Sequence, residues 1–251
     1  MAASPRLKVT AGDSVRAEWL RRVEAEYRSA AITQHLTLWL IQLGASPDLI
    51  HDGLRIVKDE LAHARLSQRT YAAAGGQDMP AIARETLGLR LGDREPLELA
   101  VTRAGVEVFC LGETVAVPLF KVLREECTVP SARAALDRIL RDEVRHRDFG
   151  WALLAHLLEL PFAPAVRELV TRDLPQMLAK VRRSYAPEGG ARRAEIPATD
   201  RAWGLMPVAR YGEILERTVE RDYVPRFGAL GFDARAAWER ACAAPRRGIP
   251  G

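Results

Sequence analysis

Apolar residues recur every three or four positions along most of this chain, which is the period of an α-helix with one buried face. In the first forty residues, for example, Leu20, Val23, Ala30 and Leu40 fall on one stripe. No segment alternates apolar and polar residues for long enough to build a sheet. The pattern therefore predicts an all-α protein.

The first two predicted helices are separated by a very short turn. The first is expected to begin at Asp13 or Ser14, either of which could cap it, and to end at Gly44. Ser46, followed by a proline, should cap a second helix that runs to about residue 74. Because only two or three residues connect these helices, we expect them to be antiparallel neighbours.

A long connection leads to a second pair of helices. Residues 77–94 contain glycines, a proline and one short helical piece, which indicates a crossover. The third helix should run from about Pro96 to Glu126, with a kink at Pro118 because proline has no N–H to donate. The turn at 128–131 should cap a fourth helix that ends near Pro161. Two antiparallel hairpins joined in this way predict a four-helix bundle.

The last third of the chain is predicted to add further helices. They span about 164–183 and 203–242, the second broken at Pro225 and Gly231, with a polar loop at 184–200 between them. The expected organisation is a flexible N-terminus, a four-helix bundle and a C-terminal helical extension that packs on the bundle. These parts cover residues 1–12, 13–160 and 161–251.

A repeated polar phrase interrupts the apolar stripes of the second and fourth helices. The sequence KDELAH occupies positions 58–63 and RDEVRH positions 141–146, so both contain Asp-Glu-x-x-His. Three residues turn a helix by about 300°, so each Glu and its His share one face, one turn apart. The repeated residues are Asp59, Glu60, His63, Asp142, Glu143 and His146.

The first and third helices each carry one carboxylate in an otherwise apolar stripe, at Glu26 and Glu113. Counted from the hairpin turns at about 1.5 Å per residue, the Glu and His side chains of all four helices fall within about two turns of one level. Four carboxylates in one buried layer repel each other, so we expect two metal ions between them. The predicted metal ligands, which are also the predicted catalytic residues, are Glu26, Glu60, His63, Glu113, Glu143 and His146.

The repeated aspartates are predicted to orient the histidines from the side of the ring that faces away from the metal. Asp59 and Asp142 can accept the ring N–H that does not face the metal, which fixes the direction of each imidazole. We expect this pairing to cross between helices, Asp59 with His146 and Asp142 with His63.

Other polar residues near this layer are assigned different roles. Glu24 and Glu107 point away from their stripes and are predicted to lie at the surface. For Cys110 and Tyr27, plain packing is favoured over pocket lining or redox chemistry, and both roles stay open. Three histidines lack a glutamate at ligand spacing and should be structural or exposed: His35, His51 and His156.

Composition adds few constraints. A net charge of +4 over 251 residues, interleaved with acidic residues, favours an ordinary solvated surface over a nucleic-acid partner. Three scattered cysteines do not make a disulfide framework, and no window is apolar enough for a membrane span. A cytoplasmic protein is expected.

These residues resemble the ferritin-like di-iron carboxylate superfamily over roughly residues 14–160. RDEVRH agrees with the Asp-Glu-x-Arg-His form of bacterial multicomponent monooxygenases, whereas KDELAH has Ala62 where that form has Arg. The segments EYRSAAITQHLTLWLIQLGASPDLI, DELAHARL and CLGET look most like small bacterial ferritin-like proteins. The resemblance implies a ferritin-like bundle with the same six ligands.

The resemblance also implies a function. We expect two iron ions, with O₂ as co-substrate, in an oxygenase or oxidase that oxidises a small organic molecule by hydroxylation, N-oxygenation, desaturation or bond cleavage. An external electron donor and a homodimer are further expectations. Mn/Fe and Mn/Mn pairs stay open, as do a ferroxidase or metal-storage protein, a tRNA-modifying di-iron hydroxylase and a purely structural helical protein.

Overall fold

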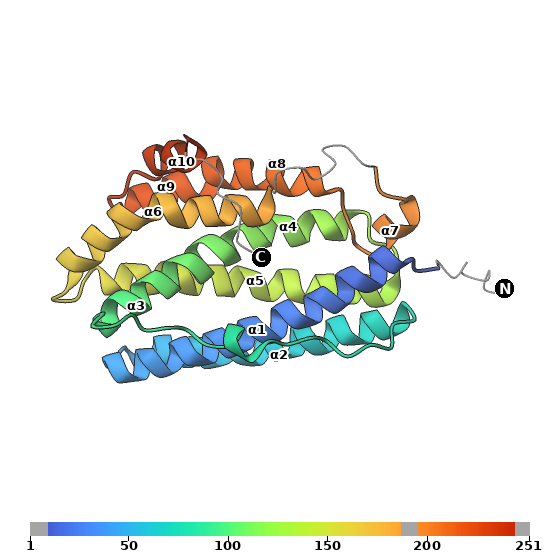
Figure 1. Ribbon diagram of the computed structural model, residues 1–251, viewed down its shortest axis with the longest axis horizontal. Coiled ribbons are helices and arrows are strands. Elements are labelled where there is room, and N and C mark those ends of the chain that lie inside the picture. Colours follow the sequence, from blue (N-terminus) through green and yellow to red (C-terminus); the bar gives the residue numbers. More distant parts are fainter. Residues whose placement is uncertain (1–9, 187–194, 244–251) are drawn as a thin grey trace.

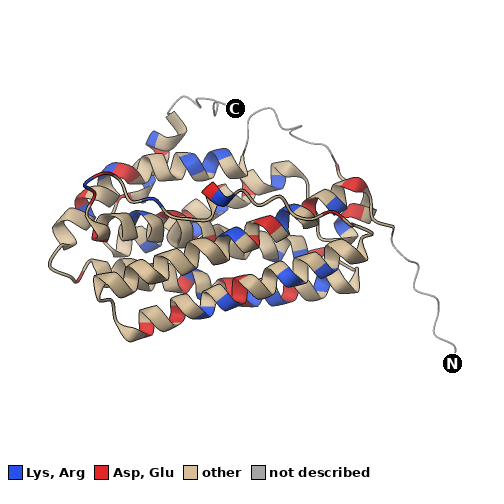
Figure 2. Ribbon diagram, turned by 60° about the horizontal axis from the view of Figure 1, so that its bottom comes forward, with Lys and Arg blue, Asp and Glu red and all other residues tan. Residues whose placement is uncertain are grey.

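A computed structural model describes residues 10–186 and 195–243, and these contain helices and no strand. The prediction of an all-α protein is therefore confirmed for the described part of the chain. Helices α1 (Asp13–Leu43) and α2 (Pro47–Ala73) form an antiparallel pair, drawn in blue and cyan in Figure 1. Charged residues of both signs are interspersed along the helices in the view of Figure 2.

The turn between α1 and α2 has the predicted chemistry. Gly44 adopts φ 73°, a left-handed conformation that favours glycine, and Ser46 accepts a hydrogen bond from the Leu49 N–H. The predicted cap at the start of α1 is wrong. Gly12 precedes that helix, and the Ser14 hydroxyl instead donates to Asp200 at 2.6 Å. Ser14 thus ties α1 to a residue far along the chain, which local sequence does not reveal.

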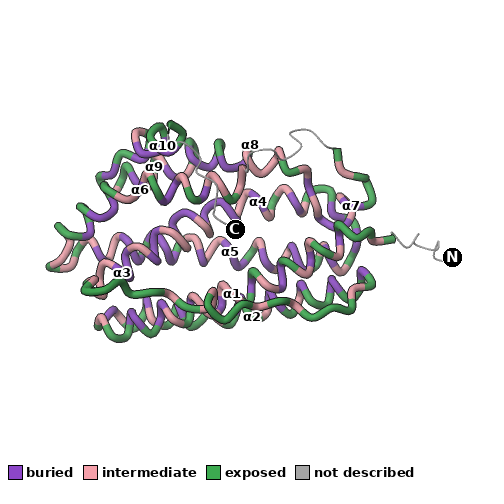
Figure 3. Tube along the Cα trace, in the orientation of Figure 1, coloured by how far each residue is buried: buried purple, intermediate pink, exposed green. Residues whose placement is uncertain are grey.

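The crossover at 77–94 runs along α1 and contains a single 3₁₀ turn, Arg84–Thr86. The crossover is largely exposed, and Figure 3 shows it mostly in green. Side chains of α1 hold it in place: Glu24 accepts from the Ala81 N–H at 2.9 Å, and His35 accepts from the Leu89 N–H at 3.0 Å.

The third predicted helix is divided by a π-helical segment. Helix α3 (Leu97–Ala104) continues into the π-helix Gly105–Glu113 and then into α4 (Thr114–Glu125). The irregularity thus precedes Glu113, whereas the predicted kink follows it; Pro118 lies inside α4. The hydroxyl of Tyr223 donates to the Leu111 carbonyl at 2.6 Å, which satisfies one acceptor of the π-helix.

Helix α5 (Pro130–Leu157) packs closely against the π-helix and carries the second copy of the repeat. A Cβ at Gly150 would lie 2.5 Å from the Cβ of Phe109, so only glycine permits this approach. The predicted side-chain cap at 128–131 is wrong, because Val129 precedes the helix without one. Instead, the N–H groups of Thr128 and Val129 donate to the Ala202 carbonyl at 2.9 and 3.0 Å.

The C-terminal helices cover one side of the bundle. Helix α6 packs on α3 and on the π-helix, and α8 packs on α4. Gly231, at φ 86°, makes the predicted break, whereas Pro225 lies in the first turn of a helix that follows a π-helical segment. The elements are α6 (Ala163–Tyr185), α7 (Ala198–Ala202), α8 (Val208–Thr218), the π-helix Val219–Tyr223, α9 (Val224–Ala229) and α10 (Ala234–Ala243).

Two predicted segments fall partly outside the described residues: residues 1–9 of the N-terminus 1–12, and residues 187–194 of the polar loop 184–200. Within the described ranges, no helix is both long and apolar enough to cross a membrane.

Candidate metal centre

The structure brings all six predicted ligand residues into one layer between four helical segments. Glu26 comes from α1, Glu60 and His63 from α2, Glu113 from the end of the π-helix, and Glu143 and His146 from α5. The imidazoles of His63 and His146 are fully buried, and their ring centroids lie 5.7 Å apart. Whether the six residues bind metal stays a prediction.

Their ligand atoms form two overlapping groups. One group contains Glu26, Glu60, His63 and Glu143, and the other Glu60, Glu113, Glu143 and His146. Within each group the ligand atoms lie within 4.8 Å of one another. Glu60 and Glu143 belong to both, which is the arrangement that two bridging carboxylates would need. These buried Glu and His groups could hold metal ions.

The two histidines are held by aspartates from the opposite hairpin. His63 Nε2 lies 3.2 Å from Asp142 Oδ2, and His146 Nε2 lies 3.6 Å from Asp59 Oδ2. The expected crossed pairing is therefore found as a hydrogen bond for His63, and only as an ion-pair contact for His146. Each histidine turns its Nδ1 toward the carboxylates: His63 Nδ1 is 3.6 Å from Glu26 and from Glu60, and His146 Nδ1 is 3.2 Å from Glu60.

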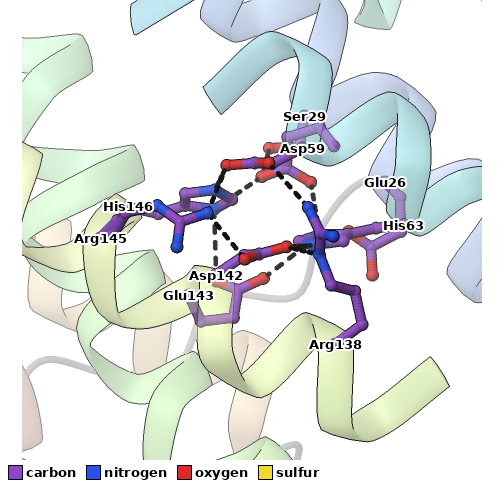
Figure 4. Close-up of polar contacts among 10 residues, drawn as sticks. Glu26, Ser29, Asp59, His63, Arg138, Asp142, Glu143, Arg145 and His146 are labelled. Atoms are coloured by element: carbon purple, nitrogen blue, oxygen red, sulfur yellow. Dashed lines mark hydrogen bonds and ion pairs between the residues drawn. The ribbon is translucent and has the colours of Figure 1, made fainter. Parts of the chain in front are cut away.

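Two arginines of α5 neutralise the aspartates. Arg145 Nη2 lies 2.8 Å from Asp59 and 2.7 Å from Asp142. Arg138 donates to Asp142 through Nε and to Asp59 through Nη2. Figure 4 shows both guanidinium groups beside the two aspartates. Arg145 belongs to the second copy of the repeat, and the first copy has Ala62 at the matching position. Arg138 thus supplies the second cation beside the two aspartates.

Ser29 adds a hydrogen bond to one bridging candidate. It lies one turn after Glu26 on α1, and its hydroxyl donates to Glu60 Oε1 at 3.0 Å. The other oxygen of Glu60, Oε2, is buried and has no hydrogen-bond partner among the described residues. Ser29 therefore restricts the carboxylate to one orientation and leaves one oxygen free to bind a ligand.

Burial makes several carboxyl groups of the layer harder to ionise in the absence of metal. It raises the pKa of Glu26 to about 7 and that of Glu143 well above its ordinary range. Burial also raises the pKa of Glu113, and nearby Glu60 adds to the effect. Glu60 is the exception: burial opposes its ionisation, but the contacts with His146 and His63 lower its pKa.

The histidines respond in the opposite way. Burial alone would lower the pKa of His63, but Asp142, Glu26 and Glu60 around it raise that pKa to about 12. Burial likewise opposes protonation of His146, and Asp59 and Glu60 raise its pKa to about 9. Without metal, both imidazoles are therefore protonated at neutral pH and act as the cations of the layer.

The donor set fits a pair of divalent cations. Four glutamates and two aspartates carry six negative charges when ionised, and Arg138 and Arg145 compensate two, so two divalent cations would neutralise the remainder. Buried polar atoms without a hydrogen-bond partner point to the same conclusion, because such atoms are costly to leave unpaired. Those that face the layer are Glu60 Oε2, His63 Nδ1, Glu143 Oε2 and His146 Nδ1.

The remaining predicted residues lie outside the two ligand groups. Glu24 accepts a hydrogen bond from the crossover, and Glu107 forms an ion pair with Lys180 at 2.6 Å. The thiol of Cys110 is buried and lies 3.2 Å from the Gly150 carbonyl, and Tyr27 is 42 % exposed. His35 is structural, and His51 is exposed and His156 half-buried.

A cavity of about 710 Å³ reaches the layer at Glu113. It lies between α1, the π-helix, α4, α6 and α8, so the C-terminal helices form one of its walls. Leu119, Phe120 and Val181 contribute apolar surface, and the phenols of Tyr185 and Tyr211 also line it. Burial raises the pKa of Tyr185, and the charges of Glu113 and Glu143 act in the same direction. The size is that of an ordinary small-molecule site.

Sequence reasoning did not identify Ser29, Arg138 or Tyr185 as parts of this region. The first two carry a usable signal, because Ser29 follows Glu26 by three residues and Arg138 precedes Asp142 by four, which places each pair on one helix face. Tyr185 ends a helix outside the four ligand-bearing segments, so no spacing in the sequence relates it to Glu113.

Comparison with family models, with curated proteins and with solved structures found no match.

Proposed function

We propose that this protein is a non-haem di-iron oxygenase or oxidase, built on a ferritin-like bundle, that uses O₂ to oxidise a small organic molecule. The proposal includes a bundle at 13–160 and an extension at 161–251 that covers it. The observation that carries it is the pair of overlapping Glu and His groups that share Glu60 and Glu143 beside a cavity.

In this proposal, Glu60 and Glu143 would serve both ions. Glu26 and His63 would complete the ligand set of one ion, and Glu113 and His146 that of the other. Bound iron would supply the one-electron and O₂ chemistry that amino-acid side chains lack. In a hydroxylation, one oxygen atom of O₂ enters the substrate and the other leaves as water, so an external donor must deliver two electrons and two protons.

The protein's own residues would set the geometry for this chemistry. Asp142 accepts the Nε2 proton of His63, which would leave the lone pair of Nδ1 for the metal. Asp59 lies 3.6 Å from His146 Nε2 and would favour the same orientation of that ring through its charge. The apolar wall at Leu119 and Phe120 excludes water from a bound molecule. A cavity that borders Glu113 supports an organic substrate over iron storage, because storage needs no such site.

Iron loading tests the proposal. The purified chain, incubated with Fe(II) without O₂ and then desalted, should retain two irons per chain by elemental analysis. Glu26→Ala should lose at least one of them, whereas Glu24→Ala, the same change two residues away on α1, should retain both. On admitting O₂, the wild-type protein should consume it and change its near-ultraviolet absorption.

Three results would count against this proposal. Retention of no iron would remove the metal centre, and equal loading of both variants would place the iron elsewhere. Many irons per chain in a cage-sized particle would indicate the storage alternative.

A further inference from the structure

The cavity beside Glu113 contains acidic groups that are already engaged. Glu18 interacts with Arg21 and Arg22, Glu24 accepts from the Ala81 N–H, and Glu107 pairs with Lys180. A cationic ligand would have to compete with these partners. The acidic residues of the lining therefore do not favour a cation.

One basic residue of the lining keeps an unused donor. Arg22 is 6 % exposed; its Nε donates to Glu18 at 3.0 Å and its Nη2 to the Gly204 carbonyl at 3.1 Å. Its Nη1 is buried and makes no hydrogen bond of normal geometry among the described residues, although the phenol of Tyr211 interacts with the guanidinium. An unpaired donor on a buried guanidinium is unfavourable, and an anion in the cavity would satisfy it.

The guanidinium of Arg22 is also held firmly in place. It lies 4.5 Å from the ring centroid of Trp19 and 6.0 Å from that of Phe120, which lines the cavity. The two hydrogen bonds and two aromatic faces fix the group before any ligand arrives, so little entropy is lost on binding.

We propose that the cavity binds an amphipathic carboxylic acid, whose carboxylate pairs with Arg22 and whose apolar body packs on Leu119 and Phe120 toward Glu113. This inference rests on the proposed function, because it names the class of substrate that the proposed reaction would oxidise. The binding step itself depends only on the cavity.

Helix geometry limits the length of this acid. Arg22 precedes Glu26 by four residues, which is about 6 Å along α1. The Arg22 side chain turns back toward Glu18, one further turn away, so its guanidinium lies roughly 10 Å from the metal layer. The carbon that is oxidised should therefore lie well away from the carboxylate, near the far end of a medium-length chain or ring.

Calorimetric titration of the full chain with octanoate and with 1-octanol tests this inference. The two probes differ at the charged end only. Octanoate should bind, and Arg22→Gln should weaken that binding about 10- to 100-fold, the range for a hydrogen bond to a charged group. Binding of 1-octanol should be weaker in the wild-type protein and unchanged by Arg22→Gln.

Two further variants serve as controls. Arg21→Gln removes a neighbouring charge that is 71 % exposed, and it should leave octanoate binding within about twofold of wild type. Ala25→Trp, at an exposed position that lines the cavity, should block both probes without touching Arg22. Because Ala25 is exposed, this variant also keeps the test valid if Arg22→Gln fails to fold.

Several outcomes would overturn the inference. They are no binding of octanoate, equal binding of octanoate and 1-octanol, and equal losses for Arg21→Gln and Arg22→Gln. A loss that follows Arg28→Gln instead, at another basic residue of the lining, would also overturn it. The same titration on metal-free and on anaerobic Fe(II)-loaded protein separates the two proposals. Octanoate binding that depends on Arg22 without metal supports the cavity even if iron does not load.

Discussion

Asp142 is the residue on which the interactions behind the layer of Glu and His residues converge. Its carboxylate contacts His63 Nε2 and accepts from both Arg138 and Arg145. Burial would hinder its ionisation, but His63 and the two arginines lower its pKa. Asp142 is thus an anion that holds the imidazole of His63 in one orientation, although Asp142 is not one of the six predicted ligands.

Asp142→Asn should therefore weaken metal binding without removing a ligand. The amide keeps the shape of the side chain but loses the charge that orients His63, and such changes typically cost 10- to 100-fold in metal affinity. Competition with a chromogenic chelator would measure the change for Mn(II). Asp137→Asn, on the exposed side of α5 where Asp137 pairs with Arg124, is the matched control and should bind as wild type. Equal affinity of both variants would contradict the role of Asp142.

At the scale of single residues, the sequence located the layer because each predicted ligand breaks an apolar stripe. Glu26 and Glu113 stand where a core residue is expected, and the crossed Asp–His pairs follow from two antiparallel copies of one phrase. Arg138 and Ser29 could not be assigned in the same way, because an arginine or serine on a helix is usually solvated. Their partners on other helices, Asp59 for Arg138 and Glu60 for Ser29, became evident only once α1, α2 and α5 were placed together.

At the scale of elements, the contact between α5 and the π-helix sets the distance between Glu113 and Glu143. Gly150 lies two turns after Glu143, and Phe109 lies one turn before Glu113. A Cβ at Gly150 would be 2.5 Å from the Phe109 Cβ and 2.8 Å from its carbonyl carbon. Backbone atoms cannot move aside as a flexible side chain can. A Cβ at position 150 would therefore force α5 and the π-helix apart.

Gly150→Ala should therefore destabilise the fold by about 1–3 kcal/mol, the usual cost of overpacking. It should also lower the affinity for metal, because Glu113 would move away from Glu143. Gly228→Ala in α9 meets nothing within 4 Å and should be neutral or stabilising. Urea unfolding and the chelator competition would be measured for both variants. A Gly150→Ala protein as stable as Gly228→Ala would show that this contact is not tight.

Most elements were predictable, and the errors have two causes. Gly44, Ser46 and Gly231 act through local backbone geometry, so the sequence predicts their turns. The caps predicted at Ser14 and at 128–131 were wrong because Asp200 and the Ala202 carbonyl, both from α7, take part there. The π-helix before Glu113 was missed because apolar spacing of three and four does not distinguish it from an α-helix over a few turns.

At the scale of the whole molecule, the layer of Glu and His residues joins both predicted hairpins through buried charge. Without metal, the protonated imidazoles of His63 and His146 balance part of the carboxylate charge between α1, α2 and α5. Their pKa values of about 12 and about 9 lie above the ordinary histidine value near 6.5. At a pH between the ordinary and the raised value, each histidine is therefore protonated in the folded protein and neutral in the unfolded chain.

The stability of the metal-free protein should consequently fall as the pH rises above neutrality. The raised pKa values of His63 and His146 contribute stability that is fully present below about pH 6.5 and is lost as the pH rises through the folded-state values. Between about pH 7 and 9.5 each imidazolium contributes a slope of up to ~1.4 kcal/mol per pH unit, so a fall of a few kcal/mol is expected.

Metal should remove most of this pH dependence, because a histidine that binds metal is neutral and has no proton to lose. Urea unfolding at pH 7 and 9.5, with and without Mn(II) under anaerobic conditions, would measure the difference. Buried groups such as Cys110 and Tyr223, whose pKa values burial also raises, affect both forms equally and cancel in the comparison. Parallel losses of stability in the two forms would contradict the role of this layer as a metal site, since the protons that His63, His146 and the buried carboxyl of Glu143 would release to a metal are what separate the two curves.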